Sequence, residues 1–576
     1  MVVTLRLHRV LSFSLRSLSL TFVILQASYA GAQPPTHSQQ GMVTSAHPLA
    51  SQAGLTTLQQ GGNAVDAAVA TTLTISVVEP FSAGIGGGGF LVLRLAKNNE
   101  IKALDFREKA PLKATRDLYL NAKGKIKPGA STDGHLAVAV PGTIAGLYEV
   151  HQKYGKLPWA QVVQPSIALA EDGFTVSDRL SQAIQRRQAT FKQNSAARQI
   201  FLPQGQAPKT GDRLVQKDLA KTLKTLVRNP QSFYTGAVAD AIATDMTQNG
   251  GLVSKKDLQT YKPTWREPVC GQFRQAKVCS MPPPSSGGVH LLQMLQMVEN
   301  ENFKDRWHHP DILHVLIESM KIAYADRATY LGDPDFVSVP TAELISPAYA
   351  RLRRQEITAQ ARSATEVKAA DPKVLEAIRQ RKESNDTSHL TVVDKDRNAV
   401  SLTFTINLGF GAGVVAEGTG IVLNNEMDDF AAAPGVPNAF GLVGGEANAI
   451  APGKIPLSSM TPTIVTENNK LRLATGAPGG STIITTVLQT LINVLVYDQD
   501  AAQAMASPRL HHQWRPEPVM VERWGFDVLT LQNLQQRGHQ MIMGSGWGNA
   551  NLILVKPDGS LEGAADPRGD GIALGY

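Results

Sequence analysis

Residues 385–394 read NDTSHLTVVD, with a threonine at position 387 heading a run of β-forming residues. The pattern predicts a strand over residues 388–393, a turn over 394–398 and a second strand over 399–406. The preceding residues 351–383 carry nine Lys or Arg and five Asp or Glu, which is typical of an exposed helical or mobile stretch. Thr387 therefore lies where a charged segment meets a sheet.

Strand and helix signals continue on both sides of this junction. Further strands are predicted at residues 90–95, 420–423, 462–466 and 552–555. Helices are predicted at residues 63–70, which Asn63 opens, and at 311–327, whose apolar residues form an amphipathic stripe. We therefore expect one α/β unit of sheet layers covered by helices. Residues 387–576 have too few helices to cover their own strands, so we expect both sides of the junction to share one core.

The first residues have the three parts of a secretory signal peptide. Arg6, Arg9 and Arg16 come first, an apolar run covers residues 17–25, and small residues fill 27–32. The apolar run is about half of the roughly 20 residues that a membrane anchor needs. We expect export, with cleavage near Ala30 or Ala32 and no membrane anchor afterwards.

The composition is that of a globular protein and gives no indication of nucleic-acid binding. Of the 576 residues, 43% are hydrophobic and 18% are charged, and the formal net charge is +7. Loss of the three signal-peptide arginines lowers that charge to +4. The remaining Lys and Arg are scattered, without the interleaved aromatic residues that would stack on single strands, so we expect no nucleic-acid partner.

Cys270 and Cys279 are the only cysteines, and they lie on two predicted short strands joined by a turn. Export would allow them to pair as a disulfide. Such a small loop would contribute about 2 to 3 kcal/mol by the chain-entropy estimate, so the bond would be a local staple. No further ligands with suitable spacing for zinc stand nearby, so we expect no metal site.

The glycine run at residues 84–89 formally matches a dinucleotide-binding fingerprint. That fingerprint must open a helix whose N-terminus receives the pyrophosphate, whereas these glycines run directly into the strand predicted at residues 90–95. We interpret the run instead as a tight backbone passage beside an active site.

Thr387 has two interpretations. For any single threonine, a β-branched residue in a sheet is the usual one. Alternatively, cleavage before Thr387 would free an α-amine, with an ordinary pKa of about 7.7 to 8.0, that could act as the general base for the residue's own hydroxyl.

Five separated runs decide between these interpretations, because they resemble the γ-glutamyltransferase family of N-terminal-nucleophile hydrolases from about residue 40 to 576. The runs are residues 105–108 (DFRE), 281–288 (MPPPSSGG), 424–430 (NNEMDDF), 456–460 (PLSSM) and 476–481 (GAPGGS). The resemblance implies a four-layer αββα sandwich and self-cleavage between Asp386 and Thr387. The chain would then comprise a signal peptide (1–32), a large subunit (33–386) and a small catalytic subunit (387–576) within one shared fold.

The resemblance also implies a site for an amino acid head group. Arg107 would bind the α-carboxylate of a γ-glutamyl substrate, with Ser458 and Ser459 adding hydroxyl donors. Asp429 would pair with the α-ammonium, assisted by Glu426 and the Asn407 amide oxygen. The backbone N–H groups of Gly479 and Gly480 would bind the oxyanion, and Thr405 would hydrogen-bond the nucleophile.

By this resemblance Thr387 attacks the γ-amide of glutathione and related compounds, and water or an amino acid or dipeptide acceptor resolves the resulting ester. No metal or organic cofactor is needed. Residues 434–446 resemble the lid of the family, but Phe440 stands where many bacterial members carry a tyrosine that hydrogen-bonds the residue corresponding to Asn407. We predict a more mobile lid that still shields the pocket with an aromatic face.

Two alternatives are open at this stage. The substrate could be a glutaryl-type acyl amide, as in the related cephalosporin acylases, although Asp429 would then lack its ammonium partner. The chain could also be an uncut binding or surface protein with this fold. His389, two residues from Thr387 on the same predicted strand, could share its face, but we expect no catalytic role for it.

Overall fold

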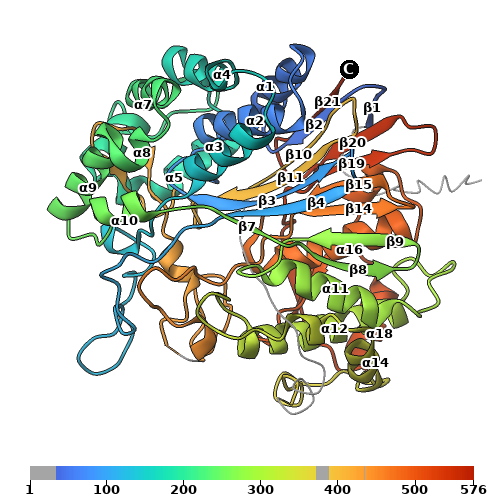
Figure 1. Cartoon of the computed structure of the whole chain (residues 1–576). Helices are drawn as coiled ribbons and strands as arrows, with labels where there is room; N and C mark the ends of the chain where they lie inside the picture. The colour runs from blue at the N-terminus through green and yellow to red at the C-terminus, as the bar shows by residue number, and fades with distance from the viewer. Residues whose placement is uncertain (1–33, 372–387, 434) are drawn as a thin grey trace, which may run out of the picture.

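The computed structural model describes residues 34–371, 388–433 and 435–576, and two seven-stranded antiparallel sheets form its centre (Figure 1). The β10 sheet has the order β21 (Ile572–Gly575), β2 (Met42–Ser45), β10 (Ser388–Val393), β11 (Ala399–Thr405), β3 (Gly88–Leu95), β4 (Glu100–Phe106) and β7 (Thr264–Arg266). The β15 sheet has the order β1 (Thr36–Ser38), β20 (Leu561–Ala565), β19 (Asn551–Val555), β15 (Lys470–Gly476), β14 (Thr463–Glu467), β9 (Ala276–Ser280) and β8 (Val269–Phe273).

The two sheets face each other across an apolar layer. Val92, Val393 and Ala399 of the β10 sheet meet Ile464 and Ile553 of the β15 sheet there, and all five are fully buried. Successive side chains of a strand point to opposite faces of its sheet. One face of each sheet can therefore pack against the other sheet, while the opposite face packs against helices.

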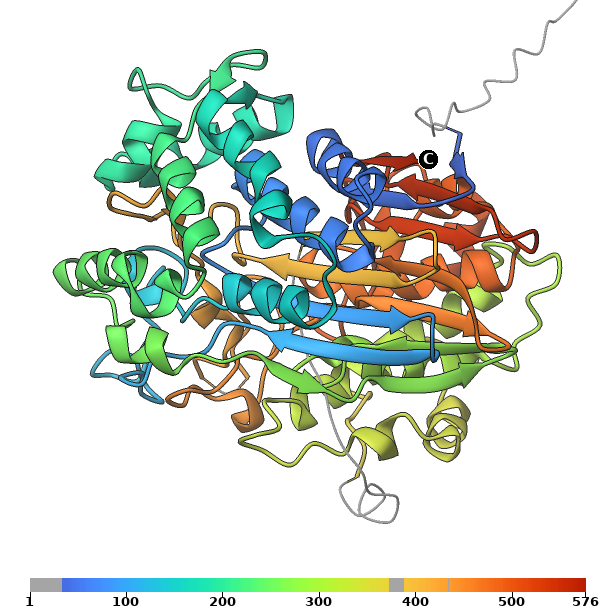
Figure 2. The ribbon, with the colours of Figure 1, turned by 45° about the horizontal axis from the view of Figure 1, so that its top comes forward.

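Helices cover both outer faces (Figures 1 and 2). On the β10 sheet side lie α1 (Pro48–Gln59), α2 (Ala64–Val78), α3 (Thr143–Tyr154), α4 (Trp159–Asp172), α5 (Asp178–Phe191), α6 (Ser195–Phe201), α7 (Lys217–Arg228), α8 (Ser232–Thr235), α9 (Ala237–Gln248) and α10 (Lys255–Thr260). On the β15 sheet side lie α11 (Ser286–Val298), α12 (Pro310–Tyr330), α13 (Thr341–Leu344), α14 (Pro347–Gln355), α16 (Ile483–Leu495), α17 (Ala501–Ala506) and α18 (Val528–Gln536). The predicted four-layer αββα sandwich is confirmed.

Both sheets mix strands from before residue 372 with strands from after residue 387. In the β10 sheet, β10 lies between β2 and β11, and β11 in turn pairs with β3. In the β15 sheet, β14 pairs with β9 on one side and with β15 on the other. The hydrogen-bond ladders therefore cross between the two parts of the chain, so neither part contains a complete sheet.

The predicted elements agree with the structure apart from the exposure of one helix. The strands predicted at residues 388–393, 399–406, 420–423, 462–466, 552–555 and 90–95 correspond to β10, β11, β13 (Ile421–Val422), β14, β19 and β3. Helix α2 starts in a capping box between Asn63 and Asp66. Helix α12 is present, but the predicted amphipathic character is wrong, because residues 312–327 are buried on every side by neighbouring elements.

The predicted signal peptide lies outside the described residues. Across residues 34–371, 388–433 and 435–576, no helix combines the length and the apolar character needed to cross a membrane.

Candidate active site

Arg107, directly after β4, lies fully buried among three carboxylates. Its guanidinium is 2.6 Å from Glu426 Oε1, 2.7 Å from Asp429 Oδ2 and 3.7 Å from Glu108 Oε2. We call these four residues the Arg107 cluster. The Arg107 carbonyl accepts a hydrogen bond of 2.8 Å from the Tyr261 hydroxyl, which holds the backbone in place.

The cluster holds three carboxylates against one guanidinium, and all four side chains are buried. Burial raises the pKa of Glu108, and the adjacent Arg107 only partly opposes that rise. Such an arrangement matches a ligand that carries both charges, because a carboxylate can replace Asp429 on the guanidinium while an ammonium takes the released carboxylates. The cluster is therefore complementary to an amino acid head group.

Thr405 is the last residue of β11, and Asn407 follows it beside this cluster. The Asn407 N–H donates to Thr405 Oγ1 at 2.7 Å, and Asn407 Nδ2 donates at 3.0 Å to the carbonyl of Asn425, the neighbour of Glu426. Asn407 adopts φ +73°, and its side-chain Oδ1 is buried with no hydrogen-bond partner among the described residues. A buried acceptor of this kind favours a ligand that brings a donor.

The glycine run passes between Thr405 and Glu108, which confirms the predicted tight backbone passage. A Cβ atom at Gly87 would lie 1.7 Å from the Thr405 carbonyl oxygen, and one at Gly88 would lie 2.6 Å from Glu108 Oε2. Side chains at these positions would push β11 away from the Arg107 cluster. The glycines thus allow the two parts of the site to approach each other.

Gly479 and Gly480 precede α16 and turn their backbone with φ values of +132° and +56°. Among the described residues, neither N–H group has a hydrogen-bond acceptor. The Phe440 ring covers Gly480, because a Cβ atom there would lie 2.5 Å from Phe440 Cδ1. The two donors therefore remain available to a ligand beneath an aromatic side chain.

Residues 435–446, the described part of the predicted lid, are tied to the acidic end of the site. Asn438 Nδ2 donates to Asp429 Oδ1 at 3.1 Å, and the Ala439 N–H donates to Asp428 Oδ2 at 3.0 Å. Arg116 pairs with Glu446 at 2.8 Å at the end of the segment. The lid therefore contacts the carboxylate that we expect to bind the ammonium.

Ser458 and Ser459 are fully buried beside the start of α11. The Ser458 carbonyl accepts hydrogen bonds from the N–H and the hydroxyl of Ser286, at 3.2 and 2.8 Å. The preceding Leu457 N–H donates to Asn448, whose amide donates at 2.7 Å to the Asp429 carbonyl. This chain of contacts joins the serine pair to the Arg107 cluster.

Asp386 and Thr387, the predicted cleavage site, lie outside the described residues. The next residue, Ser388, is buried at the start of β10 and pairs with Phe404, the residue before Thr405. His389 is fully buried between the sheets, with its two ring nitrogens 2.9 Å from Thr403 Oγ1 and Thr391 Oγ1. Burial lowers its pKa to about 3, so it remains neutral and packs the sandwich interior.

Comparisons with known proteins show the family to which the chain belongs. A family model described as gamma-glutamyltranspeptidase matches residues 50–576. The chain belongs to the γ-glutamyltranspeptidase family. It is 46% identical over 547 residues to the glutathione hydrolase proenzyme of Escherichia coli (strain K12), covering 94% of this chain and 93% of that protein.

Two solved structures place the γ-glutamyltranspeptidase-family chain in the same fold. A cephalosporin acylase from Bacillus halodurans has a TM-score of 0.85 at 30% identity, covering 97% of this chain and 99% of the other. The Helicobacter pylori gamma-glutamyltranspeptidase has a TM-score of 0.54 at 45% identity, covering 55% of this chain and 90% of that chain. The N-terminal-nucleophile hydrolase fold is therefore confirmed.

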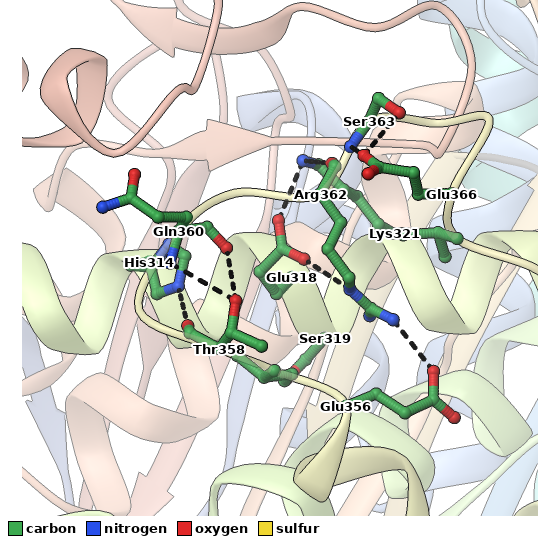
Figure 3. Close-up of polar contacts among 12 residues, drawn as sticks. His314, Glu318, Ser319, Lys321, Glu356, Thr358, Gln360, Arg362, Ser363 and Glu366 are labelled. Carbon is green, nitrogen blue, oxygen red and sulfur yellow. Dashed lines mark hydrogen bonds and ion pairs between the residues drawn. The ribbon is translucent and has the colours of Figure 1, made fainter.

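In this family member, residues 356–371 form a strap along α12, before the predicted cleavage site (Figure 3). Glu318 of α12 lies 2.8 Å from Lys321 Nζ and 3.3 Å from Arg362 Nε, and Lys321 donates at 2.6 Å to the Arg362 carbonyl. On the strap's other side, Trp514 Nε1 donates at 2.9 Å to the Ala364 carbonyl. The sequence predicted that residues 351–383 are exposed. This prediction is wrong at Ile357, Ala364, Val367 and Ala370, which are buried. Residues 372–383 lie outside the described part of the chain.

Three residues of the site were not predicted as site residues: Glu108, Asn438 and Asn448. Glu108 is adjacent to Arg107 in the run of residues 105–108, and this adjacency could have identified Glu108 as a site residue. The two asparagines contact Asp429 only through the folding of the 435–448 segment.

Cys270 and Cys279 are joined by a disulfide bond across the β8–β9 pair. Among the described residues, no group of three or more His, Cys, Asp or Glu side chains is arranged to hold a metal ion.

Proposed function

We propose that this family member is an exported, self-processing γ-glutamyltransferase and glutathione hydrolase with Thr387 as its nucleophile. The observation that carries the proposal is the fully buried Arg107, ion-paired with Glu426 and Asp429 beside Thr405 and Asn407. A buried cation with carboxylates on one side suits a substrate end that carries both an α-carboxylate and an α-ammonium.

The roles of the binding residues follow from their chemistry. The substrate carboxylate binds Arg107, with the Ser458 and Ser459 hydroxyls as further donors. The ammonium binds Asp429 and Glu426, and it donates to the Asn407 Oδ1 atom that has no partner among the described residues. Both ends of the head group then replace ion pairs that the cluster makes within itself.

In the reaction, Thr387 Oγ attacks the γ-amide carbon, and the α-amine of Thr387 takes the hydroxyl proton and passes it to the leaving amine. The Gly479 and Gly480 N–H groups stabilise the oxyanion, and Thr405 orients the nucleophile. Loss of the amine leaves a γ-glutamyl ester on Thr387. Water then releases glutamate, or the amine of an amino acid or dipeptide releases a new γ-glutamyl compound.

The same Thr387 hydroxyl also carries out the self-cleavage that makes Thr387 an N-terminal residue. It attacks the carbonyl of Asp386, and the resulting ester is hydrolysed to a large subunit of residues 33–386 and a small subunit of residues 387–576. The pairing of Ser388 with Phe404, next to Thr405, supports this role, because consecutive Cα atoms are only about 3.8 Å apart. The shared sheets would keep the subunits together after cleavage.

Export rests on the predicted signal peptide of residues 1–32, which would direct the chain to the periplasm or the medium. Cell fractionation of the expressed full-length chain tests this point, since mature protein that stays in the cytoplasm and begins at residue 1 would contradict it.

A glutaryl acylase activity is the second candidate, because the cephalosporin acylase has the same fold over nearly its whole length. Asp429 and Glu426 disfavour it, since a glutaryl group lacks the ammonium that would compensate two buried carboxylates. Turnover of γ-glutamyl and glutaryl anilides by the same preparation distinguishes the two, and faster glutaryl turnover would favour the acylase.

The decisive experiment is N-terminal sequencing of the small fragment of purified protein, together with a Thr387→Ala variant. We expect two bands on denaturing electrophoresis, a small fragment that begins at Thr387, and a variant that remains full length and inactive. An active wild-type protein with a single band would refute the proposal and favour an uncut binding protein.

A further inference from the structure

A cavity of about 700 Å³ lies among the turns of four β-hairpins. The turns join β3 to β4, β10 to β11, β14 to β15 and β19 to β20, and Figure 2 shows them at one end of the sandwich. Arg94 lies six residues beyond Gly88 on β3, a separation of roughly 20 Å at about 3.3 Å per residue. The cavity is therefore remote from the Arg107 cluster.

Two arginines fasten these turns through backbone carbonyl groups. Arg94 donates to the carbonyls of Arg397 and Asn469, at 2.9 and 3.1 Å. Arg397 donates to the carbonyls of Gly559 and Gln40, at 2.6 and 2.7 Å. Both positive charges are thus held at the cavity by neutral acceptors.

The charges around the cavity are not balanced. Five cationic side chains line it (Arg94, Arg397, Lys470, Arg472 and Lys556) against the two carboxylates of Glu467 and Asp558. Arg472 pairs with Glu467 at 3.9 Å, and Lys556 pairs with Glu562 at 3.2 Å. Within the described part of the chain, no carboxylate oxygen lies within 4.0 Å of the other three cations.

Arg94 shows the imbalance most clearly. Arg94 is only 4% exposed, and its Nε atom is buried with no hydrogen-bond acceptor among the described residues. Burial lowers the pKa of Arg94, which reflects the cost of holding its guanidinium group away from water. Burial also lowers the pKa of Arg397, although the negative charges of Asp394 and Asp396 partly oppose that shift.

We propose that this cavity binds a phosphate-class anion, with the buried Arg94, the partly buried Arg397 and the exposed Lys470 among the residues that line it. A phosphate group carries the negative charge that the cavity lacks, and guanidinium and ammonium groups attract it. Free phosphate compounds and the phosphates of a lipid surface share this chemistry. The site is independent of the γ-glutamyl reaction.

The test uses the full mature protein, with inorganic pyrophosphate as the probe in a calorimetric titration at about 0.15 M salt. Lys470→Glu is the main variant, because this exposed side chain makes no ion pair within the described residues and its loss should leave the hairpins folded. Lys256→Glu is the matched control, since it changes the net charge equally on the exposed surface of α10. We expect Lys470→Glu to weaken pyrophosphate binding at least about tenfold, and Lys256→Glu to change it less than about twofold.

A second measurement identifies the source of the anion. Co-sedimentation with phosphatidylglycerol vesicles that Lys470→Glu abolishes would assign the site to a lipid surface, and pyrophosphate binding without vesicle binding would assign it to a free ligand. Either result supports the proposal. Absence of both pyrophosphate and vesicle binding in the wild-type protein would overturn it, and so would equal losses in Lys470→Glu and Lys256→Glu. Hydrolysis of a γ-glutamyl anilide should be unchanged in both variants, which confirms that they fold and self-cleave.

Discussion

Replacing Asp429 by asparagine removes one carboxylate from the Arg107 cluster while keeping the size of the side chain. Asp429 Oδ2 lies 2.7 Å from the Arg107 guanidinium, and the Asp429 side chain is only 1% exposed. Glu426 still pairs with Arg107 in the variant, and the asparagine oxygen can still accept from Asn438, so we expect the protein to fold and to cleave itself.

The magnitude follows from the loss of a buried charge-assisted hydrogen bond to the substrate ammonium. Such losses cost about 2 to 4 kcal/mol. They correspond to a fall in kcat/KM of roughly 30- to 1,000-fold for a γ-glutamyl anilide. A glutaryl anilide has no ammonium, so its kcat/KM should fall by less than about fivefold in the same variant.

The assay measures kcat/KM for both anilides on mature Asp429→Asn protein, after electrophoresis shows that cleavage is complete. Asp428→Asn is the matched control, because Asp428 accepts from Ser131 and from the Ala439 N–H and makes no ion pair with Arg107. It should affect both substrates by less than about fivefold. Equal losses for the two anilides in Asp429→Asn, or a γ-glutamyl loss below about fivefold, would refute the assignment of Asp429 to the ammonium.

Three further predictions concern the glycine pair, the lid and the strap. In Gly480→Ala the new Cβ atom would lie 2.5 Å from the Phe440 ring, so the backbone would have to shift and carry with it the N–H group proposed to bind the oxyanion. Loss of such a donor should lower kcat by roughly 100-fold or more. Gly418→Ala, also at positive φ but with open space around it, should keep its activity; similar losses in both variants would show that only backbone strain matters. Phe440→Tyr should change the ratio of transfer to hydrolysis, measured with a dipeptide acceptor, because the family resemblance predicts a hydrogen bond from a tyrosine hydroxyl at this position to Asn407. An unchanged ratio would count against a role of position 440 in acceptor choice. Glu318→Gln should lower the free energy of unfolding in urea by about 3 kcal/mol, because Lys321, 2% exposed, loses its counter-ion. Glu356→Gln, at a carboxylate that is 37% exposed, should cost less than about 1 kcal/mol; equal costs would mean that the buried pair does not stabilise the strap.

Several features of the protein could be predicted from local sequence alone. The strands next to Thr387 repeat with a period of two, Asn63 and Asp66 form a capping box, and the four glycines at residues 86–89 have no side chains to keep two backbones apart. Each of these signals acts over a few neighbouring residues, so it can be read without knowledge of the fold. The resemblance of five runs to the family added the prediction of which residues bind the substrate.

Other features depend on contacts between residues far apart in the sequence, and only the tertiary structure decided them. The sequence of α12 predicted an amphipathic helix with one exposed face, but the strap and residues after 510 also cover that face, so Glu318 and Lys321 are buried as an ion pair. Arg107 pairs with Glu426 and Asp429 more than 300 residues away, and because all three are buried they form an interior charged cluster and not a surface salt bridge. The four hairpin turns likewise have ordinary turn sequences, and the positive cavity exists only because both sheets bring them to the same end. Local sequence determines which element forms, whereas burial and charge balance depend on which elements the fold packs together.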